Sequence, residues 1–136
     1  MNQRGFATLE VILMVMVIGI LASVAVPRFT SVTAAANSAK IQADLSTIDA
    51  AIAVYYMEGG KADGLSKIAD LNGYLNDAAK IKPPTGKAYV KGTDETITEL
   101  TIPSDYEFNT DKTRAVLKID STEYTAGDFT TKKSTT

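Results

Sequence analysis

The chain lacks both cysteine and histidine. Without cysteine it has no disulfide, no thiol nucleophile and no thiolate metal site. Without histidine it also lacks the commonest general base and the commonest metal ligand. An enzyme would have to work with carboxylates, lysine and tyrosine alone. We therefore expect no enzyme, and we assign no catalytic residue, no cofactor and no metal ligand.

Charge is nearly balanced, since 14 Lys and Arg residues face 16 Asp and Glu residues and the net charge is −2. This balance does not indicate a general nucleic-acid binder. The charges are nevertheless very unevenly placed, because Glu10 is the only charged residue between Gly5 and Arg28. The run from Phe6 to Val26 is 21 residues long and otherwise free of charge. That length matches the roughly 20 residues that a helix needs to cross a bilayer core.

Glu10 is costly in such a run, by about 2.5–3.5 kcal/mol on insertion scales. Three interpretations of this apolar segment compete. A secretory signal peptide would be cut at the small residues 23–25 (Ser-Val-Ala), and a plain anchor would stay uncut, but neither needs an acid. The third is cleavage between Gly5 and Phe6, which gives Phe6 a free α-amino group. That group lies four residues from Glu10, about one helical turn, and could pair with this carboxylate or a neighbouring subunit's.

The motif Arg-Gly-Phe-x-x-x-Glu before a continuous apolar run resembles the class III signal of type IV pilins and type II secretion pseudopilins. The resemblance implies that a prepilin peptidase/methyltransferase cuts after Gly5 and methylates Phe6, and that Glu10 serves assembly. Gly19 and Pro27 fall where the family carries residues bounding a helix stretch that can unwind in filaments. A proline inside a helix also predicts a kink where the helix leaves the membrane. The motif covers about the first quarter of the chain.

The resemblance divides the chain into three parts. Residues 1–5 would be the prepilin leader, residues 6–27 the transmembrane and filament-core helix segment, and residues 28–136 the extracytoplasmic head. It implies a single-pass protein of the cytoplasmic (inner) membrane that passes into an extracytoplasmic or cell-surface filament. Its partners would be the membrane before assembly, its own copies in a helical homopolymer, the peptidase, an inner-membrane assembly platform and minor pilins. The absence of cysteine departs from many major pilins with a C-terminal disulfide, and favours a pseudopilin or a disulfide-free pilin.

The segment from Phe29 to Tyr56 has no Gly and no Pro and carries an apolar stripe with helical spacing. We expect it to continue the membrane helix until Gly59-Gly60 ends it. The stripe consists of Ile41, Leu45, Ile48, Ile52 and Tyr55. The predicted fold class is α+β, with one long N-terminal helix packed on a small C-terminal antiparallel sheet.

The rest of the head is predicted from shorter patterns. Residues 64–80 predict a short amphipathic helix, and the turn 82–86 (Lys-Pro-Pro-Thr-Gly) ends it. The order of residues 73–90 also resembles, weakly, the loop of major pseudopilins. Strands are expected at 87–91, 96–102, 106–108 and 114–119, with residues 109–112 as a hairpin loop and residues 127–136 frayed.

The core should form where the sheet covers the stripe. On the last strand Val116 and Lys118 should face outward. Ala115, Leu117 and Ile119 can face inward on that strand. The strand residues expected in the core are Leu100, Ile102, Leu117 and Ile119.

Two charged groups in the head offer weaker site candidates. Asp105, Asp111 and Asp120 could hold calcium, but they lack the dense spacing of a calcium loop, and we favour solvated turn acids. The lysines at positions 80, 82, 87 and 91 could contact DNA phosphates in an uptake pilus, but we favour a solvated loop.

The sequence therefore predicts a non-enzymatic filament subunit that serves secretion, motility or DNA uptake. The alternative from another class is a signal- or anchor-bearing extracytoplasmic binding domain that does not polymerise.

Overall fold

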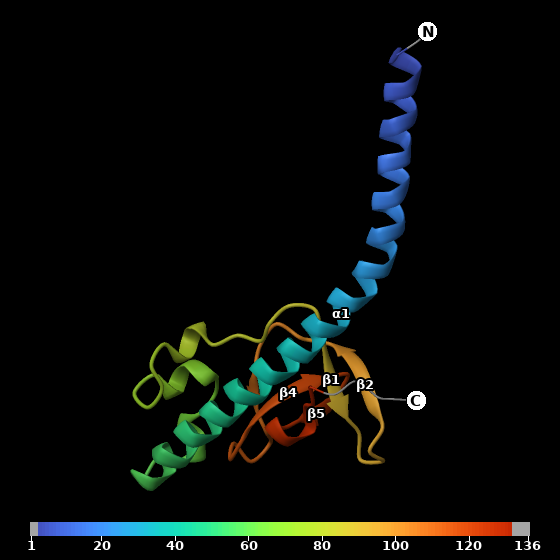
Figure 1. Ribbon diagram of the computed structural model, residues 1–136. Helices are drawn as coiled ribbons and strands as arrows, with labels where there is room; N and C mark the ends of the chain where they lie inside the picture. The colour runs from blue at the N-terminus through green and yellow to red at the C-terminus, as the bar shows by residue number, and fades with distance from the viewer. Residues whose placement is uncertain (1–2, 132–136) are drawn as a thin grey trace. The chain divides into compact units, whose positions relative to one another are not determined.

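A computed structural model describes residues 3–131, without the side chains of Pro27 and Arg28 (Figure 1). The chain divides into two compact units, one ending at Val32 and one beginning at Thr33. The first unit consists of the N-terminal part of helix α1 (Gln3–Met57). The second unit, the head, contains the rest of α1 and all of the strands. The expected α+β layout, a long N-terminal helix followed by small antiparallel sheets, is confirmed.

Helix α1 ends where the glycines predict. Gly59 has φ +89°, a conformation that side-chain-bearing residues rarely adopt, and its N–H donates to the carbonyl of Tyr56 at 3.0 Å. The N–H of Gly60 donates to the carbonyl of Tyr55, also at 3.0 Å. The helix covers the whole predicted range from Phe6 to Tyr56 and extends it slightly at both ends.

The prediction of an amphipathic α-helix at residues 64–80 is wrong. The segment forms three 3₁₀ helices instead, namely η1 (Ala62–Gly64), η2 (Ile68–Leu71) and η3 (Ala78–Lys80). Asp77 adopts a left-handed conformation with φ 56° directly before η3, which a continuous helix does not allow. The apolar spacing still identified the inward-facing side chains, because Leu65, Ile68 and Leu71 are buried.

Two strands form the first sheet. β1 (Lys87–Lys91) pairs antiparallel with β2 (Ile97–Thr101), with Tyr89 opposite Glu99. Both strands lie where the β-branched and aromatic residues predict them. On its other edge, β1 is hydrogen-bonded by side chains of α1 rather than by a full strand. Asn37 donates to the carbonyl of Lys87 at 2.9 Å, and the hydroxyl of Ser38 accepts from the N–H of Tyr89 at 2.7 Å.

The second sheet has the order β3-β4-β5. The predicted hairpin is confirmed, since β3 (Glu107–Phe108) pairs antiparallel with β4 (Ala115–Ile119). β5 (Thr122–Tyr124) was not predicted, and it pairs with the other edge of β4. Val116 is therefore on the central strand, and it is buried rather than outward-facing as expected. Lys118 is exposed, as predicted.

The prediction that residues 127–136 are frayed is wrong for the residues up to Thr130. Helix η4 (Ala126–Asp128) is followed by Phe129, which is buried and bridges Val90 of β1. The N–H of Thr130 donates to the carbonyl of Tyr89 at 3.1 Å. Residues 132–136 lie outside the described residues.

The core lies between α1 and the sheets, as the stripe predicts; within the head, Figure 1 draws α1 across β1 and β4. Tyr55 and Leu100 are half-buried at its margin and the other expected members are buried. The expected core residues that are buried are Ile41, Leu45, Ile48, Ile52, Ile102, Leu117 and Ile119. Ala115, which could face inward, is buried as well.

Candidate functional site: the N-terminal apolar segment

The N-terminal part of α1 is long and apolar enough to cross a membrane. An 18-residue window has a mean hydropathy of 2.7, and none of it is buried within the chain. Large apolar side chains point outward all around it, from Phe6, 72% exposed, to Val26, 61% exposed. A helix that is apolar on every side needs a cover from lipid or from other protein chains.

The predicted processing and assembly residues all lie in this helix. Gly5, Phe6 and Glu10 are helical and exposed. Phe6 and Glu10 are four positions apart, so a rise of about 6 Å separates them along the helix axis. Nothing in the structure tests the cleavage after Gly5 or the methylation of Phe6, so both stay predictions.

Glu10 borders an apolar hollow on the helix surface. The hollow is shallow and open, and its other lining residues are Leu13, Met14, Val17 and Ile18. The hydroxyls of this segment are bonded to the helix itself, because Thr8 donates to the carbonyl of Arg4 at 2.9 Å and Ser23 to that of Ile20 at 2.7 Å. Glu10 has no ion-pair partner among residues 3–131. The hollow therefore combines an unpaired acid with an apolar surface.

Gly19 and Pro27 lie inside the helical range of α1. A Cβ added at Gly19 would meet nothing within 4 Å, so packing within the chain does not require a glycine there. The expected role of the two residues in unwinding is not tested by the structure and stays a prediction.

The acids considered for calcium are not brought together. Asp111 lies in the loop before β4 and Asp120 in the turn after it, so they flank opposite ends of a five-residue strand. That separation is about 17 Å or more, beyond the reach of one ion. Asp105 lies 3.7 Å from the ammonium of Lys82. Across residues 3–131 no cluster of three or more acids could hold a metal ion.

The lysine strip is largely neutralised by nearby acids. Lys80 pairs with Asp77 at 2.9 Å, and Lys91 pairs with Glu95 at 2.9 Å. Together with the Lys82 contact, three of the four lysines have a carboxylate partner. This arrangement fits the solvated loop better than a phosphate-binding surface.

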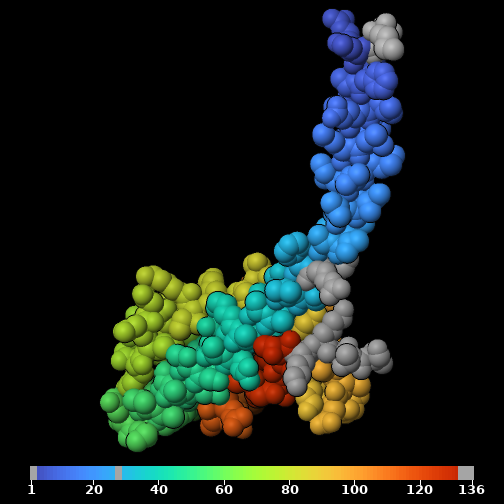
Figure 2. Space-filling view, in the orientation of Figure 1, coloured from blue at the N-terminus to red at the C-terminus, as the bar shows by residue number. Residues whose placement is uncertain are grey.

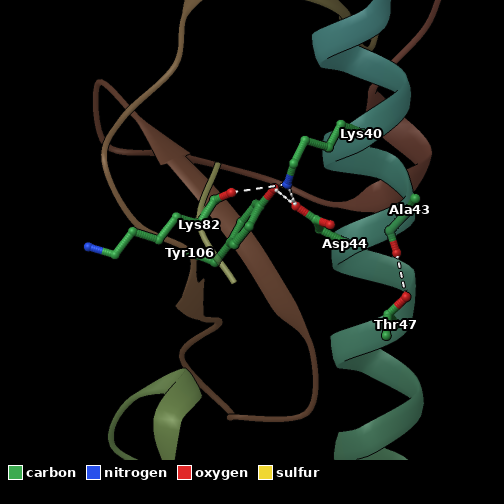
Figure 3. Close-up of polar contacts among 6 residues, drawn as sticks. All are labelled: Lys40, Ala43, Asp44, Thr47, Lys82 and Tyr106. Atoms are coloured by element: carbon green, nitrogen blue, oxygen red, sulfur yellow. Dashed lines mark hydrogen bonds and ion pairs between the residues drawn. The ribbon is translucent and has the colours of Figure 1, made fainter. Parts of the chain in front are cut away.

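Within the head, a polar cluster that sequence reasoning missed fastens the loops around Lys82 and Tyr106 to α1 (Figure 3). The phenol of Tyr106 donates to Asp44 at 2.7 Å, and Asp44 also pairs with Lys40. Lys40 donates to the carbonyl of Lys82 at 3.1 Å. Burial, and then the hydrogen bond to Asp44, raise the pKa of Tyr106 well above its usual range. The phenol thus stays protonated and serves as a structural donor.

A second polar contact joins the helix to β4. The carboxylate of Asp49 accepts from the N–H of Ala115 at 2.6 Å. Burial raises the pKa of Asp49, and the hydrogen bond from Ala115 partly opposes this. No short motif in the sequence marks the contacts of α1 with Lys82, Tyr106 and Ala115, because each joins residues more than 40 positions apart.

A membrane-capable N-terminal helix followed by a small α+β head is the layout of a pilin. The comparisons with known proteins agree. The chain is 37% identical over 54 residues to the "Type IV narrow pilus major component PilA5" of Thermus thermophilus, covering 40% of this chain and 47% of that protein. It is 31% identical over 61 residues to the "Type IV major fimbrial protein FimA" of Dichelobacter nodosus, covering 45% of this chain and 38% of that protein.

The matched parts make up less than half of each of these relatives. No family model matches the chain, and no solved structure matches it. The two matches, with the layout, support assignment of the chain to the type IV pilin family, as its N-terminal motif predicts.

Proposed function

We propose that the protein is a structural subunit of a type IV pilus-like filament, either a disulfide-free pilin or a major pseudopilin, and has no enzymatic role. The observation that carries the proposal is the unburied, largely apolar run from Phe6 to Val26, in which Glu10 is the only charged residue. Both curated relatives are named as major subunits of such filaments. Before assembly the run anchors the chain in the cytoplasmic membrane, and afterwards it packs in the filament core.

The transfer from membrane to filament is energetically reasonable. The run makes apolar contacts with lipid in the membrane and with neighbouring helices in the filament. Since lipid tails are as apolar as the side chains, the transfer itself can be close to neutral, and close packing or polar pairing then decides it. Gly19 and Pro27, if they allow a helix stretch to unwind, would let neighbouring subunits adjust to this packing.

In the proposed filament, Glu10 supplies the polar pairing between subunits. Cleavage after Gly5 creates the α-amino group of Phe6, and this ammonium pairs with Glu10 of its own or of a neighbouring subunit. A buried carboxylate is tolerated when it is paired and costly when it is alone. The pair would therefore favour assembled over separate subunits and fix their register.

The processing enzyme in this proposal is a prepilin peptidase/methyltransferase. Assembly would use an inner-membrane platform and minor pilins, and the filament would serve secretion, motility or DNA uptake.

Mass spectrometry of the mature N-terminus tests the proposal against its rivals. A chain beginning with methylated Phe6 is the expected result. A chain beginning at Val26 would mean a signal peptide, and a chain beginning at Met1 would mean a plain anchor; either would overturn the proposal.

A further inference from the structure

The head carries one group of exposed large apolar side chains among its described residues, 33–131. Its members are Val54, Met57 and Tyr74, which are 45%, 85% and 36% exposed. Val54 and Met57 are three positions apart in the last turns of α1, so they share one helix face. We call these three residues the head patch. In Figure 2 the end of α1 (green) lies against the loop that contains Tyr74 (yellow-green).

Contacts with Tyr55 hold the Tyr74 side of the head patch in place. The ring of Tyr74 packs edge-on against Tyr55 with centroids 5.5 Å apart. The phenol of Tyr55 donates to the carbonyl of Lys61 at 2.8 Å. A Cβ added at Gly60 would approach the Tyr55 ring to 2.4 Å, so the glycine allows a close contact that fixes the loop on the helix. A preorganised apolar surface of this kind is suited to binding.

A second group of exposed apolar side chains follows the bilayer-length run. Phe29 and Val32 are 70% and 66% exposed, and their spacing of three places them on one helix face. We call them the stem patch. Phe6–Val26 already has the length needed to cross the bilayer core, so these two side chains lie beyond that run along the helix.

We propose that the head patch docks onto the stem patch of a second copy of the chain. This inference rests on the proposed function. Two different surfaces on one chain that fit each other make a head-to-tail contact, which propagates into an open helical polymer when it does not close into a ring. The flanking charges are complementary in sequence, since Glu58 follows Met57 and Arg28 precedes Phe29.

The surface of α1 next to the head patch also fits an apolar helix as the occupant. Among the exposed residues of α1 from Thr33 to Met57, Lys40 is the only charged one. The acids of this stretch turn inward, Asp44 to Tyr106 and Asp49 to Ala115. A second helix can therefore approach with little charge to desolvate.

Cysteine cross-linking tests the contact directly, because the chain has no cysteine of its own. The full-length double variant Val32→Cys/Met57→Cys is produced in the native host, and its filaments are pelleted and oxidised. A disulfide needs Cα atoms about 4.4–6.8 Å apart, so it reports a close contact. We expect a ladder of cross-linked multimers on non-reducing gels. Each single variant should stay mostly monomeric.

The matched control is Val32→Cys/Lys118→Cys, since Lys118 is also exposed but lies on β4, outside the head patch. It should give no ladder. Pelleted filaments of the test variant without a ladder would overturn the docking and leave the proposed function standing. An equal ladder from the control would also overturn it, as non-specific collision. Absence of filaments from the wild-type chain would overturn the proposed function and the docking together.

Discussion

Replacing Ile48 by Ala perturbs the core of the head at a position where α1 faces the sheets. Ile48 is 0% exposed. The substitution removes three carbon atoms, which at about 0.8 kcal/mol each amounts to roughly 2.4 kcal/mol of lost transfer free energy. The cavity left behind adds to this, so we expect a loss of about 3 kcal/mol, within the range of about 2–5 kcal/mol for such truncations. Ile52→Ala should fall in the same range, since Ile52 is 1% exposed.

The matched control is the residue before Ile48. Thr47 is exposed, and its hydroxyl donates only to the carbonyl of Ala43 at 2.8 Å in its own helix (Figure 3). Thr47→Ala should change the unfolding free energy by no more than about 0.5 kcal/mol. Urea unfolding of a soluble fragment that begins at Arg28, followed by circular dichroism, measures both changes. A loss below about 1 kcal/mol for Ile48→Ala, or one equal to that of the control, would refute the assigned core.

The soluble fragment beginning at Arg28 should fold and remain monomeric in analytical ultracentrifugation, because the assembly segment is removed; filaments from this fragment would contradict the role given to that segment. Gly5→Leu should leave uncut precursor in the membrane on immunoblots, since the peptidase needs a small residue before the cut, and normal maturation would count against the processing account. The N–H groups of Lys67 and Ser66 bond to Asp70 and lower its pKa below its usual value near 3.8. Its stabilising effect is thus present above that value and disappears as the pH falls through the lowered pKa. Asp70→Asn should cost stability at pH 7 and progressively less as the pH falls below the usual carboxyl range; a difference independent of pH in urea titrations would contradict this.

The parts of the fold that the sequence predicted depend on long or repeated patterns. The helix follows from a stretch without Gly or Pro, and its buried face follows from the stripe that includes Ile41 and Leu45. The β-branched residues of β2 and the loop before β4 likewise predicted strands correctly. The family followed from the motif at residues 4–10, in which Gly5, Phe6 and Glu10 have stated chemical roles.

The missed features depend on tertiary contacts. The segment 64–80 has helical apolar spacing, but Asp77 and the bonds to Asp70 favour short 3₁₀ turns. Phe129 is buried only because the chain end returns to Val90, which no local pattern indicates. The contact of Tyr106 with Asp44 likewise joins distant segments. The sequence does not indicate the head patch, because the exposure of an apolar residue depends on the fold.

The pairing of Glu10 with the α-amino group of Phe6 is the central claim, and the Gln variant of Glu10 tests it most directly. Glu10→Gln keeps the shape and removes the charge, leaving the Phe6 ammonium unpaired in a filament core, a cost of roughly 3–5 kcal/mol if it is fully buried. Cleavage after Gly5 should continue, since the scissile bond is untouched. The measurement is the yield of pelletable filament per mature subunit for wild type, Glu10→Gln and Glu10→Ala. The account predicts that both variants lose filaments while mature subunits accumulate in the membrane, whereas wild-type yield from Glu10→Gln would contradict the charge pairing.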